Sequence, residues 1–456
     1  MTTRPTSPSE DFHQDTDEAL RVAAMEEAEG ISPPIQPGTL EMPRVISALR
    51  HRNFRYFWFG NFLSNIGTWM QSVAQGWLVL VLASQAPPAL FGSTGQRSAF
   101  WLGVVAFAAS APMLAFTLIG GVIADRVDKR RLLIRTQSVM MFSALTLSVL
   151  TFTRLINIPE IVLLAFITGT AMSLNMPGYQ ALVPSLVPRE DLTNAVALNS
   201  AQFNLSRVLG PTLGGFVMFW WGIPANFLLN AISFLAVIFA LTRIEYPVPA
   251  QQDDSAGLWQ RLGEGFRYVQ ERRQMSSLIL LVALASIFGV PFLMFVPLFA
   301  KDILHVGERG LGLLMACSGA GAFLGASTIA YLGKIKNRGR FVVISASGFF
   351  AAIIAFTFSR EFALSGAMLA IAGYCMILTV ANVNSLLQHL ADDSMRGRVM
   401  SIYATAFLGF APVGSLIAGS LAGAITAPIA IAGMSSLALV GTWGLYFSRK
   451  ELRQLD

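Results

Sequence analysis

Arg207 is the clearest candidate for a chemical role, because it is the only charge in the middle of a long apolar segment. Placing an arginine at the centre of a membrane helix costs roughly 2.5–3.5 kcal/mol or more, so such a residue normally faces a polar cavity. Two interpretations stay open. Arg207 binds an anionic substrate group or takes part in coupling, or it bonds neighbours such as Asn204 and is structural.

A stripe of polar residues is the second candidate. Steps of three and four residues separate its members, which places them on one face of a helix. They are Asn61, Asn65, Thr68, Ser72 and Gln75. Polar side chains are unfavourable in lipid, so this face lines a water-filled pathway or bonds neighbouring helices.

An aromatic stripe runs along segment 277–299. Its members are Phe288, Phe292, Phe295 and Phe299. Such a stripe indicates either packing against another helix or the wall of a cavity for a bulky, partly apolar substrate. Pro291 and Pro297 favour a kink in the same segment. Weaker candidates for cavity lining are Tyr374, Asn382 and Tyr403.

A short charged turn, 125–131, separates two apolar segments. It is too charged to lie in hydrocarbon, so we predict a tight cytoplasmic connection. Asp125 can face the positive N-terminus of another helix, and a contact that forms in one conformation only would act as a latch. Alternatively, the basic residues only anchor the turn in the cytoplasm. The latch candidates are Gly121, Asp125, Arg126, Lys129 and Arg130.

Small residues and a proline mark segment 195–220, at Gly210, Pro211, Gly214 and Gly215. Proline removes a backbone hydrogen bond and crowds the preceding turn, and glycine lets another helix approach closely. The pattern predicts an interrupted, kinked helix at a moving interface, or else ordinary helix packing.

No residue pattern predicts an enzyme. The histidines lack metal-ligand spacing, and the sequence contains no plausible nucleophile–base pair and no G-x-x-x-x-G-K-[ST] loop for a nucleotide. Cys317 and Cys375 lie in apolar segments, so we expect no structural disulfide. We expect no cofactor and no metal. The net charge of +6 fits basic cytoplasmic loops rather than nucleic-acid binding.

The elements that must position these residues are membrane helices. The chain has 456 residues, 54% of them hydrophobic and 13% charged, whereas soluble proteins carry about 25% charged residues. A helix needs about 20 apolar residues to cross the bilayer. Twelve such spans lie near 56–82, 99–124, 132–152, 160–178, 195–220, 223–242, 277–299, 310–332, 341–358, 362–384, 399–422 and 427–447.

The basic residues predict that both termini are cytoplasmic. With this orientation, most of the 32 Lys and Arg residues fall on the cytoplasmic side, as the positive-inside rule requires. Those on the outer side are Arg97, Arg154, Lys301, Arg309 and Arg360.

The longest inner connection divides the spans into two sets of six. We predict four parts: a disordered acidic cytoplasmic tail at 1–43, an N-terminal half at 44–242, a cytoplasmic linker at 243–276, and a C-terminal half at 277–456 that ends in a short cytoplasmic tail. A weak internal repeat supports this division, because a shift of 201 residues relates Asp191 to Asp392 and Pro211 to Pro412.

Together, the spans, the repeat and the charged turn resemble the major facilitator superfamily. Segment 121–130 is similar to its signature between helices two and three, although Asp128 stands where the pattern often has glycine. Segment 210–215 is similar to the signature of its exporter branches. Three further blocks resemble the branch of bacterial efflux proteins that contains the enterobactin exporter, and they lie at 52–71, 175–211 and 384–419.

This resemblance implies an all-α fold of twelve transmembrane helices in two pseudo-symmetric six-helix halves with a central cavity. It implies a secondary active transporter in the bacterial inner membrane that exports a small amphipathic organic molecule, such as a siderophore, drug or metabolite, by alternating access and proton antiport. It also implies that the latch partner lies near 396–400. We expect a monomer in the bilayer.

Two questions stay open at this point. The fourth span lacks the arginine that another branch of the superfamily carries, so energy coupling is unassigned. The alternatives to an exporter are a facilitator or importer of the same fold, or a membrane sensor or scaffold that transports nothing.

Overall fold

The computed structural model describes residues 44–85, 93–244, 258–332 and 337–455. It describes the side chains of neither 115–126 nor 258–262, which lie within helices. The chain divides into two compact units, Met1–Val45 and Ile46–Asp456. The predicted tail, 1–43, and much of the predicted linker lie outside the described residues, and the fold below is that of the second unit.

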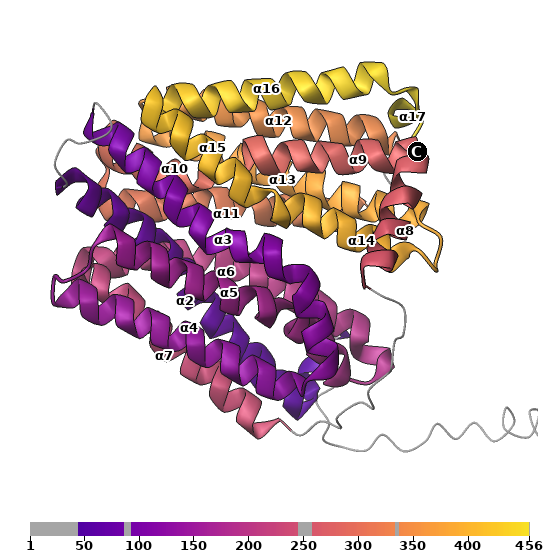
Figure 1. Cartoon of the computed structure of the whole chain (residues 1–456), viewed down its shortest axis with the longest axis horizontal. Coiled ribbons are helices and arrows are strands. Elements are labelled where there is room, and N and C mark those ends of the chain that lie inside the picture. Colours follow the sequence, from indigo (N-terminus) through magenta and orange to yellow (C-terminus); the bar gives the residue numbers. More distant parts are fainter. Residues whose placement is uncertain (1–43, 86–92, 245–257, 333–336, 456) are drawn as a thin grey trace, which may run out of the picture. The chain divides into compact units, whose positions relative to one another are not determined.

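Helices dominate the described residues, which contain no β-strand. Eleven stretches are long and apolar enough to cross a membrane. They are built from α2 (Arg52–Gln85), α3 (Thr94–Arg126), α4 (Lys129–Phe152), α5 (Ile158–Leu182), α7 (Ile223–Arg243), α9 (Arg273–Leu284) with α10 (Phe292–Leu298), α11 (Gly307–Leu332), α12 (Arg338–Phe358), α13 (Phe362–Leu390), α14 (Arg396–Ala404) with α15 (Ala411–Ala424), and α16 (Ala427–Ser448) (Figure 1).

One further long helix, α6 (Leu192–Trp221), has 30 residues and carries Arg207. Its polar residues set it apart from the eleven apolar stretches. It packs along α2 and α11, so it lies inside the bundle and we assign it as the twelfth membrane helix. The predicted all-α membrane fold is confirmed.

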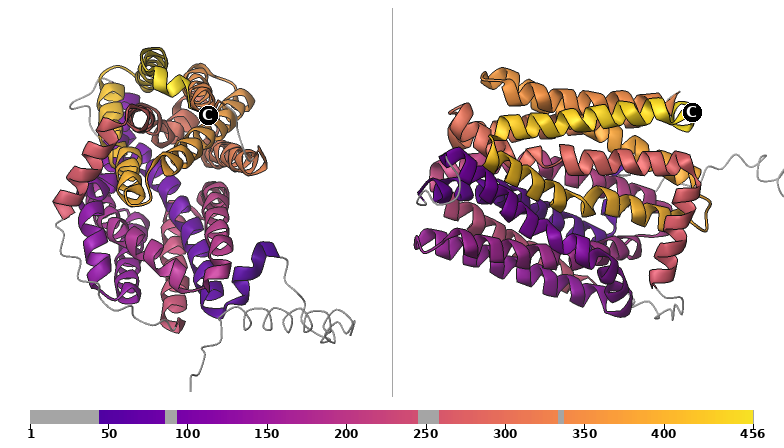
Figure 2. Two further views of the ribbon diagram at one scale, coloured as in Figure 1. Left: turned by 90° about the vertical axis from the view of Figure 1, so that its right-hand side faces the viewer. Right: turned by 45° about the horizontal axis from the view of Figure 1, so that its top comes forward.

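Helix contacts fall into three groups. Among the first six spans, α2 packs against α6 and α7, and α5 packs against α3 and α4. Among the last six, α13 packs against α11 and α12, and α12 packs against α16. Two long contacts join the sets, α3 with α15 and α6 with α11 (Figures 1 and 2). We use inner end for the end that holds Asp191 and Asp392, and outer end for the opposite one, following the predicted orientation.

Two prolines explain two irregular turns in these helices. Pro291 and Pro412 lack an N–H group and crowd the carbonyl group four residues earlier. Those carbonyl groups lie within the π-helical turns η4 (Ala285–Gly289) and η6 (Thr405–Gly409). In segment 277–299 the structure shows a π-helical turn just before Pro291, and the kink itself stays a prediction. A third π-helical turn is η5 (Phe299–Ile303).

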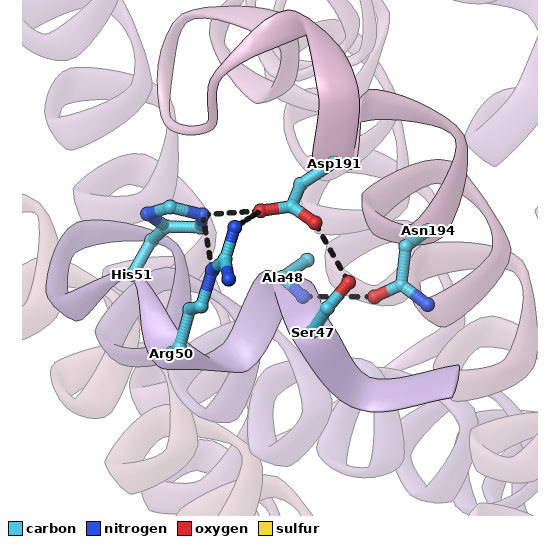
Figure 3. Close-up of polar contacts among 6 residues, drawn as sticks. All are labelled: Ser47, Ala48, Arg50, His51, Asp191 and Asn194. Atoms are coloured by element: carbon cyan, nitrogen blue, oxygen red, sulfur yellow. Dashed lines mark hydrogen bonds and ion pairs between the residues drawn. The ribbon is translucent and has the colours of Figure 1, made fainter. Parts of the chain in front are cut away.

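Asp191, at the start of α6, binds the segment that precedes α2 (Figure 3). One carboxylate oxygen accepts a hydrogen bond from the Ser47 hydroxyl at 2.7 Å. The other oxygen lies 2.8 Å from Arg50 Nη2 and 2.6 Å from His51 Nε2. These bonds hold the pKa of the Asp191 carboxyl at about 2, with His51 and Ser47 as the main causes. Asp191 is therefore ionised at neutral pH and fixes α6 beside α2.

A matching contact occurs in the other half. Asp392 lies 3.2 Å from Arg272 Nη2, directly after the surface helix α8 (Leu258–Glu271). Arg398, near the start of α14, forms a second bond to α8 through Glu264 at 2.7 Å. The sequence relation between Asp191 and Asp392 therefore extends to their contacts, since each binds the segment that precedes the first span of its half.

We predict that Asp191→Asn lowers the thermal stability of the purified protein at neutral pH, because Arg50 and His51 lose their charged partner. The carboxyl pKa is lower in the folded than in the unfolded state, so this stabilisation is present above pH 3.8 and is lost as the pH falls toward about 2. Melting curves of both proteins across this range measure the difference.

The matched control is Asp393→Asn, because the Asp393 side chain is 90% exposed and, within the described part of the chain, its ion pair is with Arg396 of the next turn. Its melting temperature should stay close to that of the unmodified protein. An equal decrease in melting temperature for the two variants would contradict a stabilising role for the Asp191 contacts.

Candidate functional site

The helix α6 belongs to the first six spans and lies where they contact the last six, because it packs against both α2 and α11. On one side, the Ser206 hydroxyl lies 3.5 Å from the carbonyl oxygen of Phe62 on α2. On the other side, a Cβ atom at Gly215 would lie only 2.8 Å from the Cα atom of Gly312 on α11. Such an approach requires glycine on both helices. The predicted packing role of Gly215 agrees with this contact.

Four residues of α6 form a strip between these two sides. They follow at steps of four, three and four residues, and they are Val196, Ser200, Phe203 and Arg207. Successive residues of an α-helix turn by about 100°, which places the strip between the α2 side and the α11 side. Val196 and Phe203 are 51% and 46% exposed, and Arg207 is partly exposed. The strip leads from the inner end to the middle of α6, and we call it the α6 strip.

The opposite exposed side of α6 has a different composition. Its members Leu205, Leu213 and Trp220 are all apolar and large, as contact with lipid favours. The α6 strip instead contains a hydroxyl group and a guanidinium group. The two exposed sides therefore suit different surroundings, and the strip suits a hydrated interior.

Arg207 lies beside the ring of Trp69, which in turn packs against Phe203. Its guanidinium carbon is 5.9 Å from the ring centroid of Trp69 on α2, within range of a cation–π contact. The Trp69 ring in turn lies 6.2 Å from Phe203, at an interplanar angle of 66°. Asn204, which we considered as a partner of Arg207, donates to the carbonyl oxygen of Ser200 instead. Among the described residues, no carboxylate forms an ion pair with Arg207.

Pro211 does not interrupt α6, which is a continuous helix from Leu192 to Trp221. The prediction of a break is therefore wrong. Pro211 has no N–H group, so the carbonyl oxygen of Arg207 lacks its usual helical donor. Gly319 of α11 packs there, since a Cβ atom at Gly319 would lie 3.1 Å from that oxygen. The carbonyl group that lacks its helical hydrogen bond therefore lies at the contact between the two halves.

The other two glycines of this motif pack against the N-terminal half. A Cβ atom at Gly210 would lie 2.8 Å from the carbonyl oxygen of Ile66, and one at Gly214 would lie 3.2 Å from the Cα atom of Met70. Gly210 and Gly214 therefore set the spacing of α6 and α2.

The polar stripe of α2 has mixed surroundings. Asn61 is buried and donates to the carbonyl oxygen of Phe57, and Thr68 donates to Ser64 of its own helix. Three members are partly or fully exposed, although α2 packs against several helices, and they are Asn65, Ser72 and Gln75. Next to them, a Cβ atom at Gly76 would lie 3.2 Å from the Cγ atom of Pro297 in the other half. The outer part of the stripe thus faces the other half.

Most of the aromatic stripe lies in the apolar core. Phe292 and Phe295 are buried, and Phe292 packs edge-on against Phe349 of α12 at 6.0 Å. Phe288 is partly buried against the same core. This placement favours the packing role of the stripe over the substrate role. Tyr403 is also buried, and its hydroxyl donates to the carbonyl oxygen of Val380.

The charged turn has a structural role in the part that the structure describes. Asp128 is the N-cap of α4, because its carboxylate accepts from the N–H of Arg131 at 3.1 Å. Arg130 donates to the carbonyl oxygen of Thr242, at the end of α7, at 2.7 Å. Lys129 is the first residue of α4. Gly121 and the side chains of Asp125 and Arg126 lie in the stretch whose side-chain surroundings the structure does not describe.

Polar contacts join the two halves at the outer end. Gln96, at the start of α3, donates to the carbonyl oxygens of Ala424 and Ile425 at 3.2 and 2.8 Å. Lys301 Nζ donates to the carbonyl oxygen of Leu80 at 3.3 Å. The Gln96 contact satisfies carbonyl groups at the end of α15 that the helix leaves without donors, whereas Lys301 bonds a carbonyl group inside the last turns of α2.

A third contact at the same end is a cation–π pair. The guanidinium carbon of Arg309, on α11, lies 3.5 Å from the ring centroid of Phe219 on α6. Together with Gln96 and Lys301, this residue forms a group that we call the outer contacts. All three of these residues lie at helix ends.

The described residues contain no group of three or more His, Cys, Asp or Glu residues that could hold a metal ion. Cys317 and Cys375 are free thiols in different helices. A pocket of about 430 Å³ lies beside Arg272 and Glu451 at the inner end, away from Arg207.

Two residues of the Arg207 surroundings were not predicted from the sequence. Phe203 lies four residues before Arg207, so helical spacing alone would place it on the same face. Trp69 comes from a different helix, and only the packing of Gly210 beside it brings its ring to Arg207.

Comparisons with known proteins agree with this geometry. Residues 44–456 match the model of the transmembrane secretion effector family. The Staphyloferrin A transporter of Staphylococcus aureus is 24% identical over 88% of this chain and 97% of its own length. The Enterobactin exporter EntS of Salmonella choleraesuis is 25% identical over 75% of this chain and 82% of its own.

Solved structures show the same fold. A bacterial homologue of the human lysosomal transporter Spinster, in an inward-facing conformation, has a TM-score of 0.66 at 14% identity and covers 92% of this chain and 98% of its own. A D-xylose-proton symporter has a TM-score of 0.65 at 14% identity and covers 88% of this chain and 98% of its own. The chain is therefore a multi-pass membrane transporter for a small molecule, and it belongs to the transmembrane secretion effector family of the major facilitator superfamily.

Proposed function

We propose that this protein exports a small amphipathic organic molecule across the bacterial inner membrane by alternating access and proton antiport. Export and a siderophore-like substrate are supported by the names of the two relatives, a Staphyloferrin A transporter and an Enterobactin exporter. We also propose a monomer with both termini in the cytoplasm, in line with the distribution of its basic residues.

The α6 strip is the observation that carries this proposal. Its exposed residues run from the inner end to Arg207 in the middle of the membrane helix. Beyond Arg207, α6 and α11 close on each other through Gly215 and Gly312. A substrate that enters from the cytoplasm can therefore reach Arg207 but cannot pass the glycine contact until the halves move.

The outer contacts and the glycine pairs together would form the gate of this cycle. A Cβ atom at Gly103 on α3 would lie 2.6 Å from the Cα atom of Gly419 on α15, so this pair is as tight as Gly215 and Gly312. Release to the outside requires both pairs to separate and the bonds of Gln96 and Lys301 to break. At the inner end, Gly121, Asp125, Arg126, Lys129 and Arg130 remain our proposed latch.

We expect proton-coupled transport in inside-out membrane vesicles that are acidic inside and contain a pH-sensitive dye. Addition of a transported siderophore should release protons within seconds, because each substrate that enters the vesicle is exchanged for protons. Vesicles without the protein are the control. Uptake of labelled substrate without a proton signal would contradict antiport, and neither signal across a broad panel would favour a sensor or scaffold.

We expect Gly215→Val to shift the protein away from the state that is closed at the outer end. The added side chain meets the backbone of α11, and such overpacking costs about 1–3 kcal/mol. In a background without Cys317 and Cys375, a reporter Ser72→Cys should react several-fold faster with an impermeant maleimide from outside.

The control for this variant is Gly433→Val on α16, where no atom lies within 4 Å of the added Cβ. Its labelling rate should match that of the parent protein. An unchanged rate in Gly215→Val, at normal abundance, would show that this contact does not limit outer opening.

A further inference from the structure

We propose that Arg207, Trp69 and Phe203 form a binding site for an anionic group attached to a planar ring. This inference rests on the export function proposed above and names the class of its substrate. The ligand has a carboxylate or another acidic group that pairs with Arg207 and a flat apolar part that contacts the two rings.

The first argument is charge. Arg207 is the middle residue of α6, and among the described residues it has no carboxylate partner. The sequence also places no Asp or Glu in the middle of any predicted span. The protein therefore supplies no counter-charge at this depth, and an anionic ligand would supply it. For the same reason the site disfavours cationic drugs.

The second argument is shape. Phe203 is 46% exposed and Trp69 is partly exposed, so part of each side chain is accessible near the guanidinium group that lies over Trp69. The ring centroids lie 6.2 Å apart and the rings are steeply inclined, which forms a corner rather than a flat wall. A planar group fits on one ring and against the edge of the other. Guanidinium presents paired donors that suit a carboxylate.

The third argument is position. The α6 strip gives access to Arg207 from the inner end, and the backbone of Arg207 contacts Gly319 of the other half. The site thus touches the surface along which the halves must move. An anion bound there would change the charge at this surface and so bias the two conformations of a transport cycle.

The test measures binding of naphthalene carboxylate and of its neutral carboxamide, which has the same ring and nearly the same shape. The full chain is purified in lipid nanodiscs, and titration calorimetry gives both affinities. We expect the carboxylate to bind roughly tenfold more tightly or better, because only it forms a charge-assisted pair.

Substitutions locate this preference. Arg207→Ala should abolish the difference between the two ligands, whereas Arg207→Lys should retain part of it. Trp69→Leu should weaken both ligands by a similar factor, since stacking does not depend on ligand charge. Arg189→Ala is the control, because Arg189 is exposed, lies on the connection before α6, and its side chain forms no bond among the described residues. It should leave both affinities unchanged.

Several outcomes would overturn the inference. Equal affinities in the unmodified protein would do so without any variant, even if Arg207→Ala fails to fold. A preference that survives in a folded Arg207→Ala protein would place the anion elsewhere. Vesicles that export cationic or neutral compounds while naphthalene carboxylate does not bind would refute the site but leave export intact. Charge-selective binding that depends on Arg207, without any transport, would support the site and refute export.

Discussion

An arginine in the middle of a membrane helix constrains the structure around it. A cation–π contact with Trp69 supplies about 0.5–2 kcal/mol, whereas the guanidinium group costs at least roughly 2.5–3.5 kcal/mol at that depth. The contact alone does not balance the cost, and no carboxylate in the described residues pairs with Arg207. The remaining stabilisation comes from water or a ligand that reaches the guanidinium group along the exposed α6 strip, whose polar members are Ser200 and Arg207.

Close packing is the second constraint, and it falls on the same helix. Gly210 and Gly214 join α6 to α2, and Asp191 fixes its first turn to the segment before α2. Gly215 faces α11 instead. The bonds to the N-terminal half include hydrogen bonds and an ion pair. The contact with α11 combines a close approach of two backbones with the cation–π pair of Arg309 and Phe219. In the proposed cycle, α6 would stay with the N-terminal half and the contact with α11 would separate.

Much of this organisation follows from the sequence. Hydrophobic run lengths and basic loops predict the membrane helices, and helical spacing predicts the polar stripe of α2. The aromatic stripe at Phe292 and Phe295 shows what helical spacing cannot predict. The spacing places the rings on one face of a helix, but it does not say whether that face lines a cavity or packs against another helix. Pro211 shows another limit. Pro211 leaves the carbonyl group of Arg207 without a helical donor, and Gly319 of the distant helix α11 packs against that carbonyl group. The sequence around Pro211 does not reveal this contact.

Trp69 and Asp191 could not be assigned from sequence for a related reason. Each acts through residues far away in the chain, and only the packed helices bring these partners together. Asp128, by contrast, was predictable in principle, since an aspartate directly before a helix is a common N-cap. Its unusual position in the turn between α3 and α4 is explained by the bond to the N–H of Arg131.

The paired contacts of Asp191 and Asp392 have a consequence for how the chain can be divided. Each aspartate holds a short surface segment that comes before the first span of its half. The helix α8 is bonded to the helices that follow it, because Glu264 pairs with Arg398, and Arg272, directly after α8, pairs with Asp392. A chain divided into two co-expressed pieces should accordingly be cut between Arg243 and Leu258, so that α8 stays with the helices that follow it.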